Sequence, residues 1–94
     1  MNTFSVSAYW DGSGAHPYQG LTKSGEYTRP GVIACGEVYE FGTRFLVKGT
    51  WYECKDRGSA VTDTHLDIWF PSEEEALEWG RQHLDVIILP PLGG

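Results

Sequence analysis

Residues 55–70 read KDRGSAVTDTHLDIWF, a stretch that runs from a glycine turn into an apolar strand. It holds two aspartates eleven positions apart, Asp56 in the turn and Asp67 in the strand. Asp67 stands between Leu66 and Ile68, so we expect its carboxylate to lie among bulky apolar side chains. A carboxylate in such surroundings is costly unless it is paired, hydrogen-bonded or shifted in pKa. This environment is typical of an acid–base catalyst.

Alternating and short apolar runs along the rest of the chain predict further strands. Strands are expected over residues 3–10, 31–35, 44–48, 51–54, 66–70 and 85–89. A tight turn at Gly49-Thr50 should join the third and fourth of these as a hairpin. Six short strands in 94 residues favour a closed barrel, because a sandwich of this size would leave long edges to cover. The expected fold class is mainly β, a small six-stranded barrel with one short helix.

The one helix is expected over residues 71–80, where the spacing of apolar residues changes. Ser72 is a good N-cap, and Glu75 completes a capping box with it. An apolar face for this helix is expected from Ala76, Leu77 and Trp79, with the tryptophan as its anchor to the core. By contrast, residues 11–20 are rich in Gly, Pro and His and are expected to form a loop.

Composition restricts the class of protein. With 94 residues, the chain is expected to be one domain over residues 1–94. Thirteen acidic against seven basic residues give a net charge of −6, which disfavours nucleic acid and anionic membranes as partners. No apolar run approaches the length of a membrane-spanning helix. The N-terminal residues lack the pattern of a signal peptide, so either the chain is trimmed or it reaches its site by another route, as phage-encoded proteins do.

Two cysteines, Cys35 and Cys54, allow two interpretations. They are either buried thiols in a reduced protein or one disulfide that ties neighbouring strands. A disulfide closing a loop of this size would stabilise the fold by roughly 3 kcal/mol on the chain-entropy model. The cysteines lack a CxxC spacing and the three histidines are scattered, so neither a metal site nor a cofactor is expected.

Several ordered pieces of the chain together resemble one known family. These pieces are residues 31–34 (GVIA), 41–47 (FGTRFLV), 56–61 (DRGSAV), 66–70 (LDIWF) and 75–81 (EALEWGR). The set resembles the 3D domain, a family named for three aspartates. Its fold is a double-psi β-barrel related to membrane-bound lytic transglycosylase A and to stationary-phase survival proteins. The resemblance covers residues 5–89.

The resemblance implies an enzyme that cleaves the glycan strands of peptidoglycan. Lytic transglycosylases break the bond between N-acetylmuramic acid and N-acetylglucosamine without adding water, and leave a 1,6-anhydro sugar. One carboxyl group can act first as acid and then as base, because the nucleophile is the C6 hydroxyl of the substrate. The resemblance also implies a place outside the cytoplasm, in the cell envelope or with a phage. Peptidoglycan or a related polysaccharide is the expected partner of a monomeric domain.

The match to the family also implies roles for single residues. Asp67 matches the catalytic acid, and Asp56 matches the aspartate that would orient the substrate or tune Asp67 by its like charge. The residues expected to contact the glycan are Thr22, Ser24, Thr43 and Gly58. Sugar stacking is expected from a tryptophan, among Trp10, Trp51 and Trp69, with Trp10 as the best candidate because it borders the loop. Alternation places His65 on the same face as Asp67.

The chain departs from the family pattern at the first of the three aspartates. That position holds Cys35-Gly36 here, so only two of the named aspartates are carried over. Asp63 is a candidate replacement, although a solvated loop position is the simpler interpretation.

Several alternatives stay open at this point. Asp56 has a structural interpretation as a turn residue, and Asp67 has one as an ion-pair partner of Arg57 or Arg44. At the level of function, the rivals are a non-catalytic wall- or polysaccharide-binding barrel like those of expansins, a two-aspartate hydrolase of β-1,4 glycans, and an interaction domain such as a phage structural part.

Overall fold

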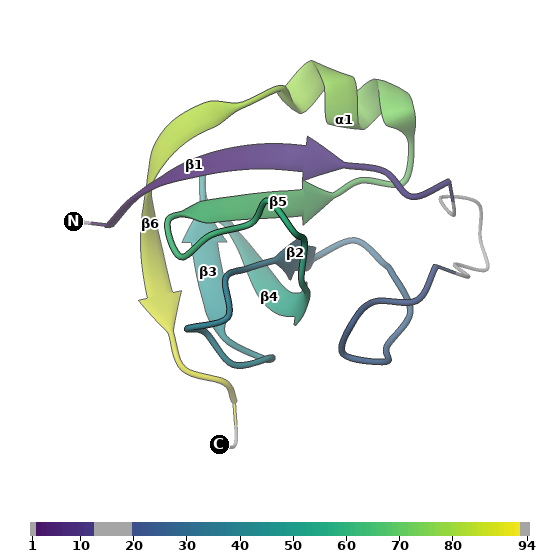
Figure 1. Ribbon diagram of the computed structural model, residues 1–94. Coiled ribbons are helices and arrows are strands. Elements are labelled where there is room, and N and C mark those ends of the chain that lie inside the picture. The colour runs from purple at the N-terminus through teal and green to yellow at the C-terminus, as the bar shows by residue number, and fades with distance from the viewer. Residues whose placement is uncertain (1, 13–19, 93–94) are drawn as a thin grey trace.

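The computed structural model describes residues 2–12 and 20–92, so most of the loop expected over 11–20 lies outside the described residues. Within the described part the chain forms six strands and one helix (Figure 1). They are β1 (Asn2–Tyr9), β2 (Val32–Ala34), β3 (Arg44–Val47), β4 (Thr50–Asp56), β5 (His65–Trp69), α1 (Glu73–Trp79) and β6 (Gln82–Leu89). Each predicted element is present, and most boundaries differ by one to three residues.

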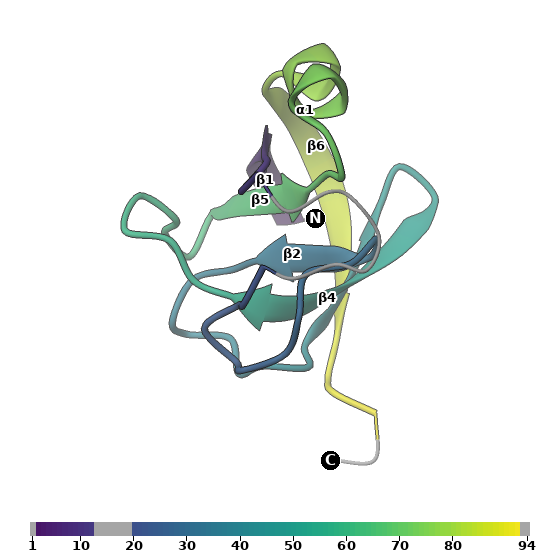
Figure 2. The ribbon, with the colours of Figure 1, turned by 90° about the vertical axis from the view of Figure 1, so that its right-hand side faces the viewer.

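The strands close into a barrel in the order β1-β5-β2-β4-β3-β6. Strand β1 runs parallel to β5 and β2 runs parallel to β4, whereas the other neighbouring pairs are antiparallel. Figure 2 shows β1 and β5 on one side and β2 and β4 below them, with β6 running past both. This arrangement confirms the predicted mainly β barrel with a single helix and is consistent with a double-psi barrel.

The hairpin between β3 and β4 turns one residue earlier than predicted. Lys48 and Gly49 have φ angles of 50° and 80°, and Val47 pairs with Thr50. Two central residues with positive φ are typical of the type I′ turn, whose twist matches that of the flanking strands. Thr50 therefore belongs to β4 rather than to the turn. The same strand continues to Asp56, so Asp56 ends a strand and does not stand in a turn.

Alternate residues of the strands fill the barrel. The core cluster consists of Phe4, Val6, Ile33, Cys35, Phe45, Val47, Cys54, Leu66, Ile68 and Val86. Successive side chains of a strand point to opposite faces. Leu66 and Ile68 therefore point into the barrel, and Asp67 between them points out of it. The expectation that these two neighbours surround the carboxylate is wrong, because they lie on the other face of the strand.

The helix α1 lies over β1 (Figure 1). Its N-cap is Ser72, whose Oγ accepts a hydrogen bond from the Glu75 N–H at 3.2 Å. Trp79 anchors the helix as predicted, since its indole Nε1 donates to the Val6 carbonyl at 3.0 Å. Leu77 was expected on the apolar face but is 73% exposed. In residues 2–12 and 20–92 there is no helix with the length and apolar character needed to cross a membrane.

Candidate functional site

Four residues on neighbouring strands form one row across the outer face of the barrel. Ser7 of β1 pairs with Asp67 of β5, Asp67 pairs with Ala34 of β2, and Ala34 pairs with Asp56 of β4. The register shifts between Ile33 and Ala34, which is the mark of a bulge. Bulges re-aim side chains, and this one brings Asp56 beside Ala34. Both predicted aspartates thus lie on one face, separated by the small side chain of an alanine.

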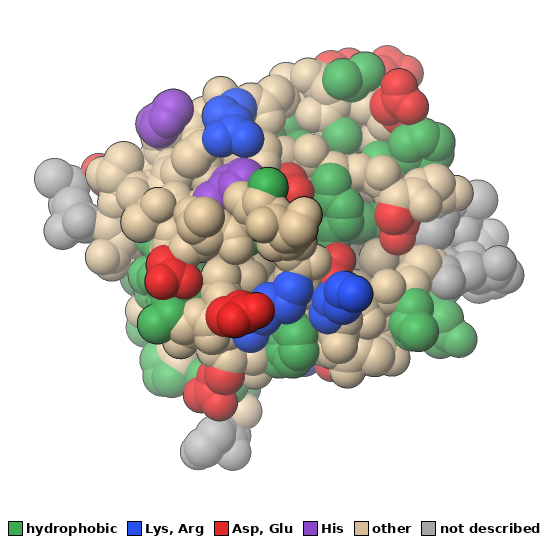
Figure 3. All heavy atoms as spheres, in the orientation of Figure 1, with side chains coloured by type: hydrophobic (Ala, Val, Ile, Leu, Met, Phe, Trp, Pro, Cys, Tyr) green, Lys and Arg blue, Asp and Glu red, His purple; other side chains and the backbone are tan. Residues whose placement is uncertain are grey.

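Asp67 is half-buried in this row and is held by a hydroxyl group. The Ser7 hydroxyl donates to Asp67 Oδ1 at 3.0 Å, and the same hydroxyl lies 2.7 Å from His65 Nε2. On the face of the molecule shown in Figure 3, a histidine and an acidic side chain lie close together over β1 and β5, and a basic side chain lies above them. His65 and Asp67 both contact the Ser7 hydroxyl, so they lie on one face, as alternation predicted.

Burial raises the pKa of the Asp67 carboxyl above its ordinary value, and the negative charge of Asp56 adds to this effect. The hydrogen bond from Ser7 and the charges of His65 and Arg81 act in the opposite direction and lower the pKa. The net pKa is raised, because removal of the carboxylate from water is the largest of these effects. A raised pKa favours the protonated form, which a general acid needs.

The alternative that Asp67 is an ion-pair partner of Arg57 or Arg44 is wrong. The Arg57 guanidinium donates to the carbonyl oxygens of Cys35 and Tyr39, at 3.2 and 2.6 Å. Arg44 Nε donates to the Pro90 carbonyl at 3.0 Å. Among the described residues, the ion pairs formed by side chains involve Glu26 and Glu53 and leave Asp67 out.

The raised pKa of Asp67 predicts a pH dependence of stability. A carboxyl whose pKa is raised by folding contributes most to stability below its ordinary pKa of 3.8, and this contribution is lost as the pH rises through the raised value. The Asn side chain of Asp67→Asn cannot ionise, so this variant does not lose that contribution. The free energy of unfolding of the variant, relative to that of the wild type, should therefore rise between pH 3 and pH 7. Urea denaturation across this range measures the difference. A difference that stays constant or falls with pH would contradict the raised pKa.

Asp56 has both carboxylate oxygens occupied by hydrogen bonds from the chain itself. Oδ1 accepts from the backbone N–H groups of Lys23 and Arg57, both at 2.9 Å, and Oδ2 accepts from the Tyr9 hydroxyl at 2.8 Å. Burial raises the pKa of Tyr9, and the bond to Asp56 raises it further, so Tyr9 remains a donor. These bonds attach the segment around Lys23 to the end of β4. The structure therefore supports the structural interpretation of Asp56, alongside its charge effect on Asp67.

Residues 32–90 match the family model described as the 3D domain. The chain belongs to the 3D domain family. The match begins at β2 and ends just after β6, so it includes both aspartates of the row. The family is typically associated with lytic-transglycosylase-like or related cell-wall domains. No curated protein sequence matches the chain.

In this 3D domain, most of the hydroxyl groups predicted to contact the glycan form hydrogen bonds within the protein. Thr22 is buried, and its Oγ1 donates to the Glu26 carbonyl at 2.8 Å. Thr43 is buried as well, and its Oγ1 donates to the Glu40 carbonyl at 2.7 Å. Ser24 is the more accessible of the three, and its N–H donates to the Lys55 carbonyl, which holds it beside β4. Their contacts with a glycan remain a prediction.

Close packing surrounds both Gly58 and Gly36 in this 3D domain, but only Gly36 meets backbone atoms. A Cβ at Gly58 would lie 2.9 Å from Val61 Cγ2, so the glycine lets the loop after β4 fold on itself. A Cβ at Gly36 would lie 2.6 Å from Asp63 Oδ1 and 2.8 Å from the Thr62 carbonyl carbon. Of the two residues at the place of the family's first aspartate, Cys35 is held in a disulfide and Gly36 has no room for a side chain. The carboxylate of Asp63 occupies the space beside Gly36.

The three candidate tryptophans lie in different surroundings. Trp69 is buried, and its indole Nε1 donates to Asp11 Oδ1 at 3.1 Å, so its predicted stacking on a sugar is wrong. Trp51 is exposed, with the Arg44 guanidinium 6.0 Å from its ring centre, and lines a hollow of about 350 Å³ that includes neither aspartate of the row. Trp10 is 40% exposed and follows β1 directly. It remains the candidate for stacking.

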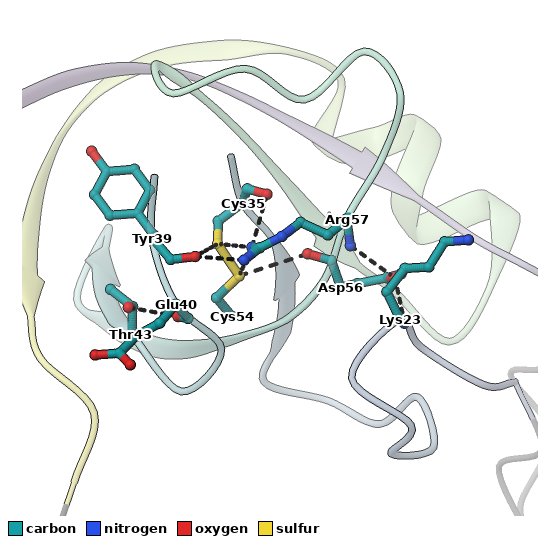
Figure 4. The surroundings of a disulfide bond; sticks show 8 residues. All are labelled: Lys23, Cys35, Tyr39, Glu40, Thr43, Cys54, Asp56 and Arg57. Carbon is teal, nitrogen blue, oxygen red and sulfur yellow. Dashed lines mark hydrogen bonds between the residues drawn. A yellow bond between two sulfur atoms is a disulfide. The ribbon is translucent and has the colours of Figure 1, made fainter. Parts of the chain in front are cut away.

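The two cysteines form a disulfide beside the end of β4 (Figure 4). Of the two interpretations left open by the sequence, the structure has the disulfide that ties β2 to β4. The Arg57 guanidinium covers it, with Nη1 at 2.9 Å from Cys35 Sγ and 3.3 Å from Cys54 Sγ. The same guanidinium stacks 4.3 Å from the ring centre of Phe41. This cluster fixes the two strands that carry Ala34 and Asp56.

Proposed function

We propose that this 3D domain cleaves the glycan strands of peptidoglycan as a lytic transglycosylase, with Asp67 as its single acid and base. The observation that carries the proposal is a half-buried carboxyl group with a raised pKa, which lies on the outer face of the barrel and accepts from the Ser7 hydroxyl. The family of the chain supports the same class of substrate. Acting on peptidoglycan places the protein outside the cytoplasm, in the envelope or with a phage, and a monomer suffices for it.

The proposed reaction needs one carboxyl group in two successive roles. Protonated Asp67 gives its proton to the glycosidic oxygen while the bond from that oxygen to C1 of the muramic acid breaks. The resulting carboxylate then takes the proton of the muramic C6 hydroxyl, whose oxygen forms the new bond to C1. The carboxyl ends the cycle protonated, and no water enters the product. A carboxyl with a raised pKa suits both roles, because acid–base catalysis is most efficient when the pKa lies near the working pH.

The surroundings of Asp56 favour this mechanism over a two-carboxylate hydrolase. Glycosidases that add water use a second carboxylate as base or nucleophile. Asp56 is the neighbouring carboxylate in the row, but its two oxygens accept three hydrogen bonds from Lys23, Arg57 and Tyr9. Those bonds stabilise its charge and hold it in place, which reduces its nucleophilicity. Asp56 is therefore assigned to positioning and to raising the pKa of Asp67.

A non-catalytic polysaccharide-binding barrel is the second candidate. The observation that favours it is the absence of the family's first aspartate: Cys35 is held in the disulfide, and Thr62 and Asp63 leave no space for a side chain at Gly36. If that aspartate is needed for turnover elsewhere in the family, its loss would leave a domain that binds glycan and does not cleave it. Trp10, exposed next to β1, would then serve as the stacking surface.

Digestion of purified peptidoglycan in water enriched in oxygen-18 distinguishes these functions. Products are separated from the insoluble wall and analysed by mass spectrometry, and the protein bound to the wall is measured by sedimentation. Anhydro-muropeptides without the heavy isotope would support the lytic transglycosylase. Reducing ends carrying oxygen-18 would indicate a hydrolase. Sedimentation of the protein without any product would favour the binding barrel, and neither binding nor product would reject glycan as the ligand.

A further inference from the structure

The Ser7 hydroxyl lies between the two titratable side chains of the row. Its oxygen is 3.0 Å from Asp67 Oδ1 and 2.7 Å from His65 Nε2. On the other side of the ring, His65 Nδ1 lies 3.0 Å from the Ala60 carbonyl oxygen. Three side chains and one carbonyl group thus form a continuous chain of hydrogen bonds from the carboxyl to the loop after β4.

The donors in this chain follow from the number of hydrogens available. The Ala60 carbonyl oxygen can only accept, so His65 Nδ1 carries a hydrogen. His65 Nε2 is then an acceptor when the ring is neutral and a donor only when the ring is cationic. Ser7 has a single hydroxyl hydrogen and can donate it to Nε2 or to Asp67, but not to both.

Two arrangements form every hydrogen bond of the chain and also use the hydroxyl hydrogen of Ser7. In the first, the imidazole of His65 is neutral and accepts from Ser7, while Ser7 Oγ accepts from a protonated Asp67. In the second, cationic His65 donates to Ser7, and Ser7 donates to an ionised Asp67. Both arrangements contain one proton more than the state in which the imidazole is neutral and the carboxyl is ionised. With no such proton, Ser7 keeps only one of these two hydrogen bonds. With two, the imidazole and the carboxyl both donate to Ser7 Oγ, and the hydroxyl hydrogen of Ser7 has no partner in the chain of hydrogen bonds.

We propose that Ser7 makes Asp67 and His65 a single proton-sharing unit, in which a proton passes between the carboxyl and the imidazole through the serine hydroxyl. The step balances as a double transfer. The Nε2 proton of His65 moves to Ser7 Oγ, and the hydroxyl hydrogen of Ser7 moves to Asp67 Oδ1, which converts the second arrangement into the first. The reverse step restores the second arrangement. Ser7 and His65 are positioning residues here, because the groups that would meet a substrate belong to Asp67.

The charges around the unit allow both arrangements. Arg81, which follows α1 and donates to the Ser5 hydroxyl at 2.9 Å, favours the carboxylate, as does a cationic His65. Asp56 on β4 and the burial of the site favour the protonated carboxyl. From β1, the Tyr9 hydroxyl also faces the carboxylates, while β2 contributes only an alanine. Opposing influences of this kind keep the proton from being fixed at either end.

The catalytic role of this unit rests on the proposed function, because the acid of a lytic transglycosylase must be protonated before each turnover. His65 and Asp67 are both partly exposed, and the unit lets the imidazole return a proton that the carboxyl has lost before substrate binds. The existence of the unit, however, can be tested without any glycan.

Nuclear magnetic resonance of the free protein tests the unit. The carboxyl carbon of Asp67 and the ring nitrogens of His65 are followed against pH in the wild type, Ser7→Ala, Ser7→Thr and His65→Gln. Sharing of a proton predicts that both wild-type signals change in the same two steps, separated by about one pH unit or more. Ser7→Ala should leave each signal with one step of its own. Ser7→Thr keeps the hydroxyl and should retain the two steps, and His65→Gln should leave a single step for Asp67.

Two results would overturn the unit. The first is an Asp67 signal that changes in one step in the wild type. The second is a two-step pattern that survives in Ser7→Ala, which would show that the groups interact through space and not through the hydroxyl. Both results are independent of product formation on peptidoglycan. The unit can therefore fail while glycan cleavage is found, and it can be present in a domain that only binds glycan.

Discussion

Asp67→Asn should lower the rate of anhydro-muropeptide release by about 10²–10⁴-fold, the factor that a general acid or base contributes. Asparagine keeps the size of the side chain, and its oxygen can still accept from the Ser7 hydroxyl, which lies 3.0 Å from Oδ1. It cannot deliver a proton to the glycosidic oxygen or take one from the C6 hydroxyl. The loss should therefore appear in kcat and leave binding to the wall nearly unchanged.

Asp85→Asn is the matched control for this substitution. Asp85 is an exposed aspartate on β6 whose Oδ1 accepts from the Thr3 hydroxyl at 2.8 Å. Like Asp67, it is a strand aspartate bound to a hydroxyl group of β1, but it does not lie in the row. Its variant should release product at the wild-type rate. A folded Asp67→Asn protein that cleaves as fast as the Asp85→Asn control would remove Asp67 from the mechanism and leave the family resemblance without its catalytic residue.

The sequence predicted those parts of the site that depend on local pattern. The period-two alternation of residues 65–70 placed His65 and Asp67 on one face, and the six strand segments predicted the barrel. The same alternation also shows that Leu66 and Ile68 point away from the carboxylate, a consequence that the apolar neighbours of Asp67 obscured. The disulfide stayed open because cysteine spacing alone does not show which strands are neighbours.

The partners of Asp67 and Asp56 could not be predicted, because they come from distant strands. Ser7 is 60 positions from Asp67, and Tyr9 is 47 positions from Asp56. A parallel pairing of the first strand with the fifth is a property of the closed barrel and leaves no local signal in either strand. The bulge beside Ala34 that places Asp56 in the row is likewise a register shift without a local signal. At Asp56 itself, the sequence suggested a turn.

Reduction of the Cys35–Cys54 disulfide should lower the free energy of unfolding by about 3 kcal/mol. The two residues are 19 positions apart, and closing a loop of that size removes conformational entropy from the unfolded chain. For a domain of this size, about 4–8 °C of melting temperature corresponds to 1 kcal/mol, so the transition should fall by about 12–24 °C. Thermal unfolding followed by circular dichroism, with and without a thiol reductant, measures the change.

The double variant Cys35→Ala/Cys54→Ala separates the cross-link from other effects of the reductant. It has no disulfide, so its melting temperature should be the same with and without reductant and should lie near or below that of the reduced wild type, because the buried sulfur atoms are also lost.

Because the bond joins β2 to β4, its loss should loosen the pairing of Ala34 with Asp56 before the pairing of β1 with β5. Hydrogen exchange should then rise first at the amide of Cys35, which donates to the Asp56 carbonyl. A wild type with two titratable thiols and an unchanged melting temperature would show that the barrel is stable without this cross-link.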